Sequence, residues 1–304
     1  INESRLGVAQ SSQCHIEVSF QKATAYAQDR LQMRAPKRIA PEKPADPIIS
    51  HPDVRRMLMT QKALTEGGRM LTYFCAQQVD LAHDNNDPDM KKRADTLLSV
   101  LTPIAKGFIS EMSVEATNLG IQVLGGHGFI KEWGLEQEYR DTRITSIYEG
   151  TTGIQGLDLL GRKILASQGK ILQPLMEDIQ GFCNTYSDHP MALEVAKHAA
   201  TLGELTKLVG KKAQSDLNEV NAAAVDYLMY GGFTVFAYFW AQAAVKAEAA
   251  IAAGTDDNFY KNKIATAKFY FSKFLPRTLT LEQTIRNGGE DLMSIPADEM
   301  SLSY

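Results

Sequence analysis

Apolar residues that recur every three or four positions over very long stretches constrain this chain more than any other feature of its sequence. From Asn2 to Met33 this spacing persists for roughly nine turns, which predicts a rod of about 45 Å at ~1.5 Å per residue. Helices of that length are typical of bundles whose members cover one another end to end. No stretch keeps the polar–apolar alternation of a half-buried strand. The sequence therefore predicts an all-α fold, an up-and-down helical bundle followed by a second helical unit.

Clusters of proline, glycine and asparagine separate the expected helices. Four prolines between Ala35 and Ile49 exclude a helix or a central strand there and predict an extended linker on the surface. Ser50 or His51 is expected to cap the next helix, and Pro103 to kink or restart the third. We place a domain boundary after residue 167, between a bundle at 1–167 and an additional helical domain at 168–304. The helices are expected at 2–33, 50–84, 88–123, 136–143, 151–167, 171–186, 191–215, 217–253 and 258–285.

Charge and hydrophobic content exclude several classes of protein. The 304 residues are 44% apolar and 22% charged, with a net charge of −4 spread along the chain, so no basic surface for a nucleic acid is expected. We expect no apolar run of membrane-spanning length, because the nearest, Ala222–Ala250, is broken by charged residues and glycines. The aromatic residues of that stretch instead predict a buried seam between helices. With no signal peptide, we expect a cytoplasmic protein without a nucleic-acid or membrane partner.

Cysteine usage points to a reducing compartment. The three cysteines, Cys14, Cys75 and Cys183, are odd in number and far apart, so neither a disulfide framework nor a metal site is predicted. Cys14 and Cys75 lie in helical patterns among apolar residues. We therefore expect them to be buried free thiols.

The stretch Thr142–Arg162 contains the best candidate for catalysis. Its Glu149 stands between apolar neighbours and directly before Gly150, a residue that lets backbone approach a ligand closely. A lone carboxylate in such surroundings is a candidate general base. From the spacing alone, the alternative that Glu149 caps or starts the following helix stays open.

Five short motifs, in this order and spacing, resemble the C-terminal helical domain of the acyl-CoA dehydrogenase family. The resemblance covers residues 1–167. The run from His51 to Met59 and the extra C-terminal unit are similar to a longer subfamily that includes 3-methylmercaptopropionyl-CoA dehydrogenases. The motifs are Asn2-Glu3-Ser4-Arg5, Tyr26-Ala27-Gln28-Asp29-Arg30, Gln122 to Phe129 with Gly125 and Gly126, Arg140-Asp141, and Tyr148-Glu149-Gly150-Thr151.

The resemblance implies an FAD-dependent α,β-dehydrogenation of an acyl-CoA thioester to a trans-2-enoyl-CoA. Glu149 matches the base that removes the α-proton, while the β-hydride passes to flavin N5. The thioester oxygen would be stabilised by the backbone N–H of the base and a ribityl hydroxyl of the flavin, an oxyanion-hole arrangement. The flavin performs the hydride chemistry, and the protein positions the reacting groups.

The resemblance also implies which residues hold cofactor and substrate. Arg30 is expected at the FAD pyrophosphate of a neighbouring subunit, since a guanidinium binds phosphate in bidentate fashion. Arg5 is expected near the CoA moiety, Tyr148 is expected to line the acyl pocket, and Gly150 is expected to contact the substrate. We expect His127 to be a local hydrogen-bonding residue and His51 a helix cap. The remaining expected FAD contacts are Gln122, Gly125 and Gly126 at the adenosine portion and Thr151 near the base.

Two of these assignments have alternatives in the sequence itself. Arg30 could be a solvated helix terminus, and Gly125-Gly126 could be an ordinary helix C-cap. Gly153 stands where a glutamine is common in the family, which removes one possible hydrogen bond to the cofactor.

The family further implies an electron-transfer flavoprotein as electron acceptor and a homodimer or homotetramer. Alternative functions are an acyl-CoA oxidase that uses O2 and a non-catalytic helical oligomerisation module. The family's N-terminal helical domain and middle β-domain have no counterpart in these residues. We therefore expect the C-terminal part of a longer enzyme, or a partial subunit, that binds FAD weakly and is inactive alone.

Overall fold

The computed structural model describes residues 2–302, and its regular structure is helical throughout that range. Within it there is no β-strand, only one isolated bridge between Leu31 and Pro47. The expected all-α fold is confirmed. Short 3-10 turns occupy Ile48–Ser50, Lys131–Trp133, Ile144–Ser146, Lys170–Leu172, Leu275–Arg277, Glu290–Met293 and Ala297–Glu299, and π-helical turns occupy Asp158–Leu165 and Tyr270–Phe274.

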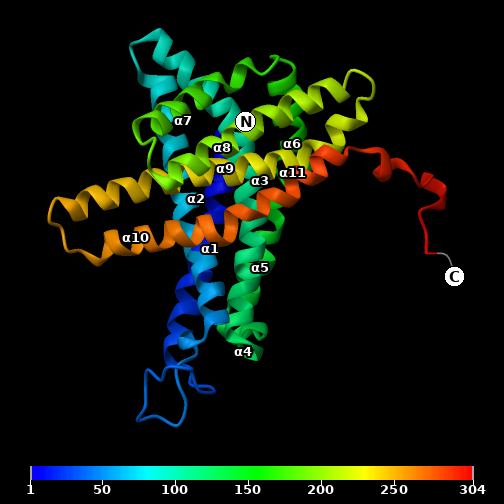
Figure 1. The fold of residues 1–304 in the computed structure, drawn as a ribbon. Coiled ribbons are helices and arrows are strands. Elements are labelled where there is room, and N and C mark those ends of the chain that lie inside the picture. The colour runs from blue at the N-terminus through cyan, green and yellow to red at the C-terminus, as the bar shows by residue number, and fades with distance from the viewer. Residues whose placement is uncertain (1, 303–304) are drawn as a thin grey trace.

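Three long helices form the first bundle. Helices α1 (Asn2–Asp29), α2 (Pro52–Asp84) and α3 (Pro88–Leu124) pack against one another along their lengths (Figure 1). α3 runs through Pro103 without a break. The short helices α4 (Gly126–Phe129) and α5 (Leu135–Arg143) follow α3, and α5 packs back onto α3 and α1.

The later helices cross one end of this bundle (Figure 1). The long helix α9 (Asn218–Ala252) lies at their centre and packs against helices on both sides, including α2 and α3. Its aromatic residues are buried, so the expected seam is confirmed. The other helices are α6 (Thr152–Leu157), α7 (Gln173–Thr185), α8 (Pro190–Lys212), α10 (Asn258–Phe269) and α11 (Thr278–Asn287).

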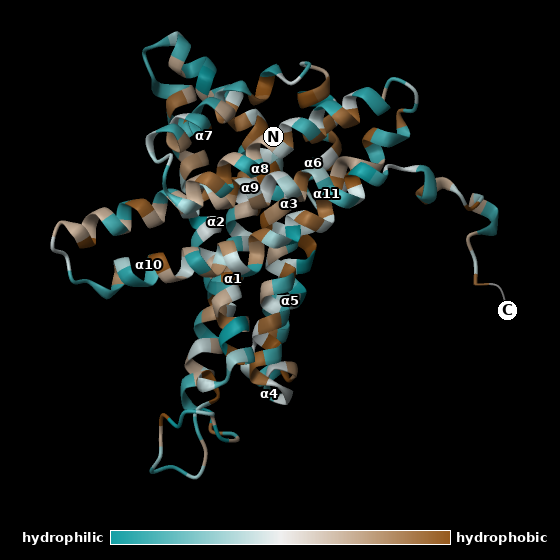
Figure 2. Cartoon of the chain, in the orientation of Figure 1, coloured by the Kyte–Doolittle hydropathy of each residue, from teal (hydrophilic) through white to brown (hydrophobic). Residues whose placement is uncertain are grey.

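One hydrophobic core joins residues from both sides of the expected boundary after residue 167. Phe108 of α3 stacks edge-on against Phe233 and Phe236 of α9, with ring centroids 4.9 and 4.8 Å apart. A second cluster at the far end of the bundle joins α1, α2, α3 and α5. After α11 the chain leaves the body as an exposed tail that carries both polar and apolar residues (Figure 2). The two-domain division itself stays a prediction.

Several local expectations were wrong. The segment from Ala35 to Ile49 is not a plain extended linker, because it folds around the fully buried carboxylate of Asp46. That carboxylate accepts the N–H groups of three residues and pairs with Arg38. Burial raises the pKa of Asp46, but the N–H donors and Arg38 outweigh it and hold the pKa below its usual range.

Two helices and two single residues also differ from expectation. The fourth helix becomes π-helical at Asp158–Leu165, and the last expected helix is interrupted at Tyr270–Arg277. Cys14 is exposed, whereas Cys75 and Cys183 are buried and free. His51 occupies the N-cap of α2, but its side chain makes no capping bond and instead contacts the carbonyl of Gln32 at 2.9 Å.

The prediction that no apolar stretch is long enough to span a membrane was also wrong. Within residues 2–302 one helix, α3, is long and apolar enough to cross a bilayer by length and composition. It is not the stretch Ala222–Ala250 that we named. In the fold, 83% of the apolar window of α3 is buried by other helices, as expected for a core helix.

Candidate active site at Glu149 and a separate groove at Arg30

Glu149 lies in a tight left-handed turn between α5 and α6. Its φ is +55°, which is uncommon for a residue with a side chain, and Gly150 follows with φ +96°. Thr151 is the N-cap of α6 and its hydroxyl accepts the N–H of Ile154 at 3.3 Å. The alternative that Glu149 caps this helix is therefore excluded.

Two buried side chains bind the turn from the inside. The Lys106 ammonium, which is fully buried, donates to the carbonyl of Gly150 at 2.6 Å. Gln155, also fully buried, donates its Nε2 to the carbonyl of Glu149 at 2.9 Å and to that of Gly150 at 3.3 Å. These contacts leave the Glu149 side chain on the outer, exposed face.

Lys106 places an ammonium group in a buried position. Burial lowers the pKa of the Lys106 ammonium to about 8, although Glu111 and Glu149 oppose the shift. Arg5 adds to it. Sequence reasoning missed both Lys106 and Gln155. The available signal for Lys106 was a single charge inside the apolar run from Val100 to Ile109.

The segment on either side of Glu149 exposes several apolar side chains. Ile144, Ile147, Tyr148 and Ile154 are each between 42% and 49% exposed, in the segment on either side of Glu149. Isolated exposed apolar residues are common, but a group around one carboxylate is typical of a binding surface. Tyr148 directly precedes Glu149 and is exposed, and its place at the acyl group stays a prediction.

Arg5 reaches the π-helical turn that follows α6. Its guanidinium donates to Asp158 at 2.7 Å, and Lys163 contacts the same carboxylate oxygen at 3.1 Å. Burial raises the pKa of Asp158, but Arg5 and Lys163 outweigh it and keep the pKa below its usual range. The Nε of Arg5 is buried and has no acceptor within residues 2–302. Arg5 is therefore held in place by Asp158, and its buried Nε–H is unused.

The expected adenosine and pyrophosphate contacts gather elsewhere. Arg30, Gln122, Gly125 and Gly126 line one groove of about 530 Å³ at the far end of the bundle. Gly125 is the C-cap of α3 with φ +60°, so the structural alternative for this glycine also holds. A Cβ added at Gly125 or Gly126 would meet no atom within 4 Å, so the backbone there faces open space.

His127 supports this groove as a local hydrogen-bonding residue, as expected. Its Nδ1 lies 2.9 Å from the hydroxyl of Tyr26, and its ring stacks on Trp133 with centroids 5.0 Å apart. Tyr26 also meets the Trp133 ring edge-on.

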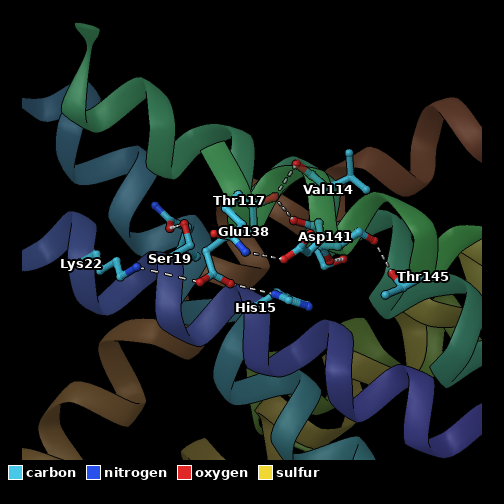
Figure 3. Close-up of polar contacts among 12 residues, drawn as sticks. His15, Ser19, Lys22, Val114, Thr117, Glu138, Asp141 and Thr145 are labelled. Carbon is cyan, nitrogen blue, oxygen red and sulfur yellow. Dashed lines mark hydrogen bonds and ion pairs between the residues drawn. The ribbon is translucent and has the colours of Figure 1, made fainter. Parts of the chain in front are cut away.

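The two groups of residues lie at opposite ends of α1. Arg5 and Arg30 are 25 residues apart, which corresponds to about 37 Å at ~1.5 Å per residue (Figure 1). Between them α5 is tied to α1 and α3 by polar contacts, among them His15 to Glu138 at 2.8 Å (Figure 3). One chain therefore presents two separate candidate surfaces on a common rigid frame.

Comparison with known proteins identifies the class. Residues 1–165 match the family model described as "Acyl-CoA dehydrogenase, C-terminal domain". Residues 175–296 match a second model, "Acetyl-CoA dehydrogenase C-terminal like". The chain belongs to the acyl-CoA dehydrogenase family.

Two relatives within this family are similar to the chain over most of its length. The chain is 38% identical over 284 residues to 3-methylmercaptopropionyl-CoA dehydrogenase of Ruegeria pomeroyi, which covers 91% of this chain and 48% of the relative. It is 32% identical to the broad-specificity linear acyl-CoA dehydrogenase FadE5 of Mycobacterium tuberculosis, over 97% of this chain and 51% of the relative. The chain thus spans about half the length of the curated relatives it matches.

Solved structures share the fold. An acyl-CoA dehydrogenase from Bacillus anthracis, solved with FAD, superposes with a TM-score of 0.67 at 22% identity, over 93% of this chain and 48% of that one. Acyl-CoA oxidase 1 of Arabidopsis thaliana superposes at 0.63 with 13% identity, over 93% and 46%. The fold is therefore common to dehydrogenases and oxidases.

Proposed function

We propose that this chain is the base-carrying C-terminal part of an FAD-dependent acyl-CoA dehydrogenase. The observation that carries the proposal is the outward-facing carboxylate of Glu149, on a left-handed turn whose carbonyls are bound from the inside. Dehydrogenase rather than oxidase is favoured because the relatives named above with at least 30% identity are dehydrogenases.

The residues of this chain perform the proton half of the reaction. Glu149 accepts the α-proton as the α C–H bond of the acyl thioester breaks. The electron pair of that bond, delocalised toward the thioester oxygen, forms the Cα=Cβ bond as the β C–H bond breaks and hydride leaves. A general base placed in this way contributes about 10²–10⁴-fold to the rate. The exposed apolar side chains Ile147, Tyr148 and Ile154 contact the acyl group and exclude water from the carboxylate. Bound FAD supplies the acceptor for the β-hydride.

The groove at Arg30 fits a second part of the cofactor. The Arg30 side chain is exposed, and Gln122 adds an amide beside the open backbone of Gly125 and Gly126. A guanidinium and backbone without side-chain obstruction are suited to a diphosphate and its nucleoside. Thr151 is expected to contact the same cofactor near the base, Arg5 to lie near the CoA moiety, and Gly150 to contact the substrate.

The distance of about 37 Å between the two ends of α1 favours an assembly. We propose a homodimer or homotetramer in which the Arg30 groove of one copy completes the FAD site near Glu149 of another. An electron-transfer flavoprotein is the proposed electron acceptor and the cytoplasm the proposed location.

The test replaces Glu149 by Gln in the complete flavin-loaded enzyme. Formation of the 2-enoyl thioester should fall by about 10²–10⁴-fold, while the bound flavin stays unchanged. The control is Glu177→Gln, an exposed glutamate on α7, which should retain wild-type turnover. Unchanged turnover in Glu149→Gln would exclude Glu149 as the base. Stoichiometric hydrogen peroxide under air would instead identify an oxidase.

A further inference from the structure

The turn that presents Glu149 is held by two side chains that cannot reach a substrate themselves. Lys106 and Gln155 are both fully buried, and both donate to backbone carbonyls of the turn. We propose that Lys106 and Gln155 are positioning residues that fix the Glu149 carboxylate by binding the carbonyls of Glu149 and Gly150 from the interior. This inference rests on the function proposed above.

The geometry of the peptide bond also sets the direction of the backbone N–H groups in the turn. In a trans peptide the carbonyl and the following N–H point in opposite directions. Because the carbonyls of Glu149 and Gly150 point inward to Gln155 and Lys106, the N–H groups of Gly150 and Thr151 point outward. Within residues 2–302 neither N–H has a protein acceptor. The carboxylate and two free backbone donors thus share one face.

The backbone conformation needs such support. A left-handed φ at a residue with a side chain costs on the order of 1–2 kcal/mol, and it persists only where neighbours determine it. Gly150 tolerates its φ of +96°, but a Cβ there would lie 2.7 Å from the Gln155 amide. Loss of the interior donors would let the Glu149 peptide rotate and would move the carboxylate.

A lysine at position 106 is costly as a core residue. Its neighbours include the carboxylates of Glu111 on its own helix and Glu149 in the turn, and the guanidinium of Arg5 on α1. Burial penalises the ammonium more than these groups compensate. An apolar side chain of similar length would fill the site without this cost. A donor to the Gly150 carbonyl is the feature that such a side chain lacks.

The test compares Lys106→Met and Gln155→Met with Lys263→Met in the complete flavin-loaded enzyme. Lys263 is a partly buried lysine that pairs with Glu66, remote in the sequence from the turn and without a role in the proposed site. Each of the first two variants should lower kcat by about 10–100-fold, since a displacement near 1 Å can cost 10²-fold, with KM for the acyl-CoA changed less than threefold. Exchange of the substrate α-proton with D2O should slow in parallel. Lys263→Met should match the wild type in both assays.

The outcomes separate this inference from the proposed function. In a Glu149→Gln background, Lys106→Met should cause no further loss of α-proton exchange, because it acts through Glu149. If Glu149→Gln abolishes turnover but Lys106→Met and Gln155→Met retain wild-type kcat and exchange, the positioning role is refuted and the base assignment stands. If Glu149→Gln keeps full turnover, the proposed function itself fails. Should Lys106→Met not fold, Gln155→Met alone decides the result.

Discussion

Helix α6 approaches the backbone of α9 so closely that a single methyl group should disrupt it. A Cβ built on Gly156 would lie 2.6 Å from the carbonyl oxygen of Ala224, 2.7 Å from its carbonyl carbon and 3.1 Å from the amide nitrogen of Val225. All three atoms belong to the backbone of α9, so no side-chain rotation relieves the contact. Gly156→Ala must therefore move the two helices apart.

The size of the effect follows from these distances. Ordinary contact begins at 3.4 Å, so the shift is 3.4 − 2.6 = 0.8 Å. Overpacking of this kind costs about 1–3 kcal/mol, and the better helix propensity of alanine offsets up to about 1 kcal/mol. We expect a net destabilisation of about 1–2 kcal/mol. Because α6 begins three residues after Glu149, the same shift should lower kcat of the complete enzyme by up to about 100-fold.

A second glycine in the same helix provides the matched control. At Gly153 the nearest atom to an added Cβ is the Thr151 hydroxyl at 3.9 Å, so Gly153→Ala should stabilise the protein by up to about 1 kcal/mol. Guanidinium unfolding followed by circular dichroism measures both changes. If the two variants shift the midpoint equally, or if Gly156→Ala is as stable as the wild type, the close approach of α6 and α9 is refuted.

Two further predictions concern buried charges and pH. The pKa of Lys106 in the folded state is about 8, below its ordinary value of 10.5, so the unfolded state binds more protons between these values and stability should rise with pH there. The shift corresponds to about 3 kcal/mol, reduced by water near the exposed turn to about 2 kcal/mol. Lys106→Met should remove this contribution to the difference in unfolding free energy between about pH 7.5 and pH 10. The pKa of Asp46 is lowered from 3.8, so this carboxylate stabilises the fold above that pH and the contribution is lost as the pH falls through the folded-state pKa. Asp46→Asn should therefore be less stable at pH 7 and lose less stability on acidification below pH 4; an acid titration identical to the wild type would contradict this.

Helix positions were predictable where the sequence contains local stop signals. Pro52 and the Asn85–Pro88 turn set the limits of α2 at Pro52–Asp84, within two residues of the expected helix. The π-helical turn at Asp158–Leu165 was not predictable, because its extra residue is accommodated by packing against other helices rather than by a local signal. The loop around Asp46 is similar: a single aspartate among prolines gives no sign that three N–H groups converge on it.

Some residues of the candidate site were likewise predictable from the sequence, and others were not. Motif order was sufficient to name Arg30 and Gln122 together, and the structure places these residues, 92 positions apart, in one groove because α1 and α3 end side by side. Motif order could not reveal Lys106 or Gln155, since their role depends on the direction of two carbonyls in a left-handed turn. Neither could it show that Arg5 is bound to Asp158, a contact across 153 residues of sequence. Their functional roles remain predictions.

α9 packs next to both residues that hold the Glu149 turn. α9 contacts α6 at Gly156, next to Gln155, and its Leu228 would lie 2.9 Å from a Cβ at Gly107, next to Lys106. Lys106 and Gln155, which hold the turn, are therefore each next in sequence to a glycine that packs closely against α9. Since α9 packs against α8 and α10, and its Phe233 and Phe236 contact Phe108 of α3, we infer that the additional helices help to fix where both interior donors lie. A change in α9 at Leu228 should therefore alter proton abstraction at Glu149 more than it alters binding in the Arg30 groove, which α9 does not line.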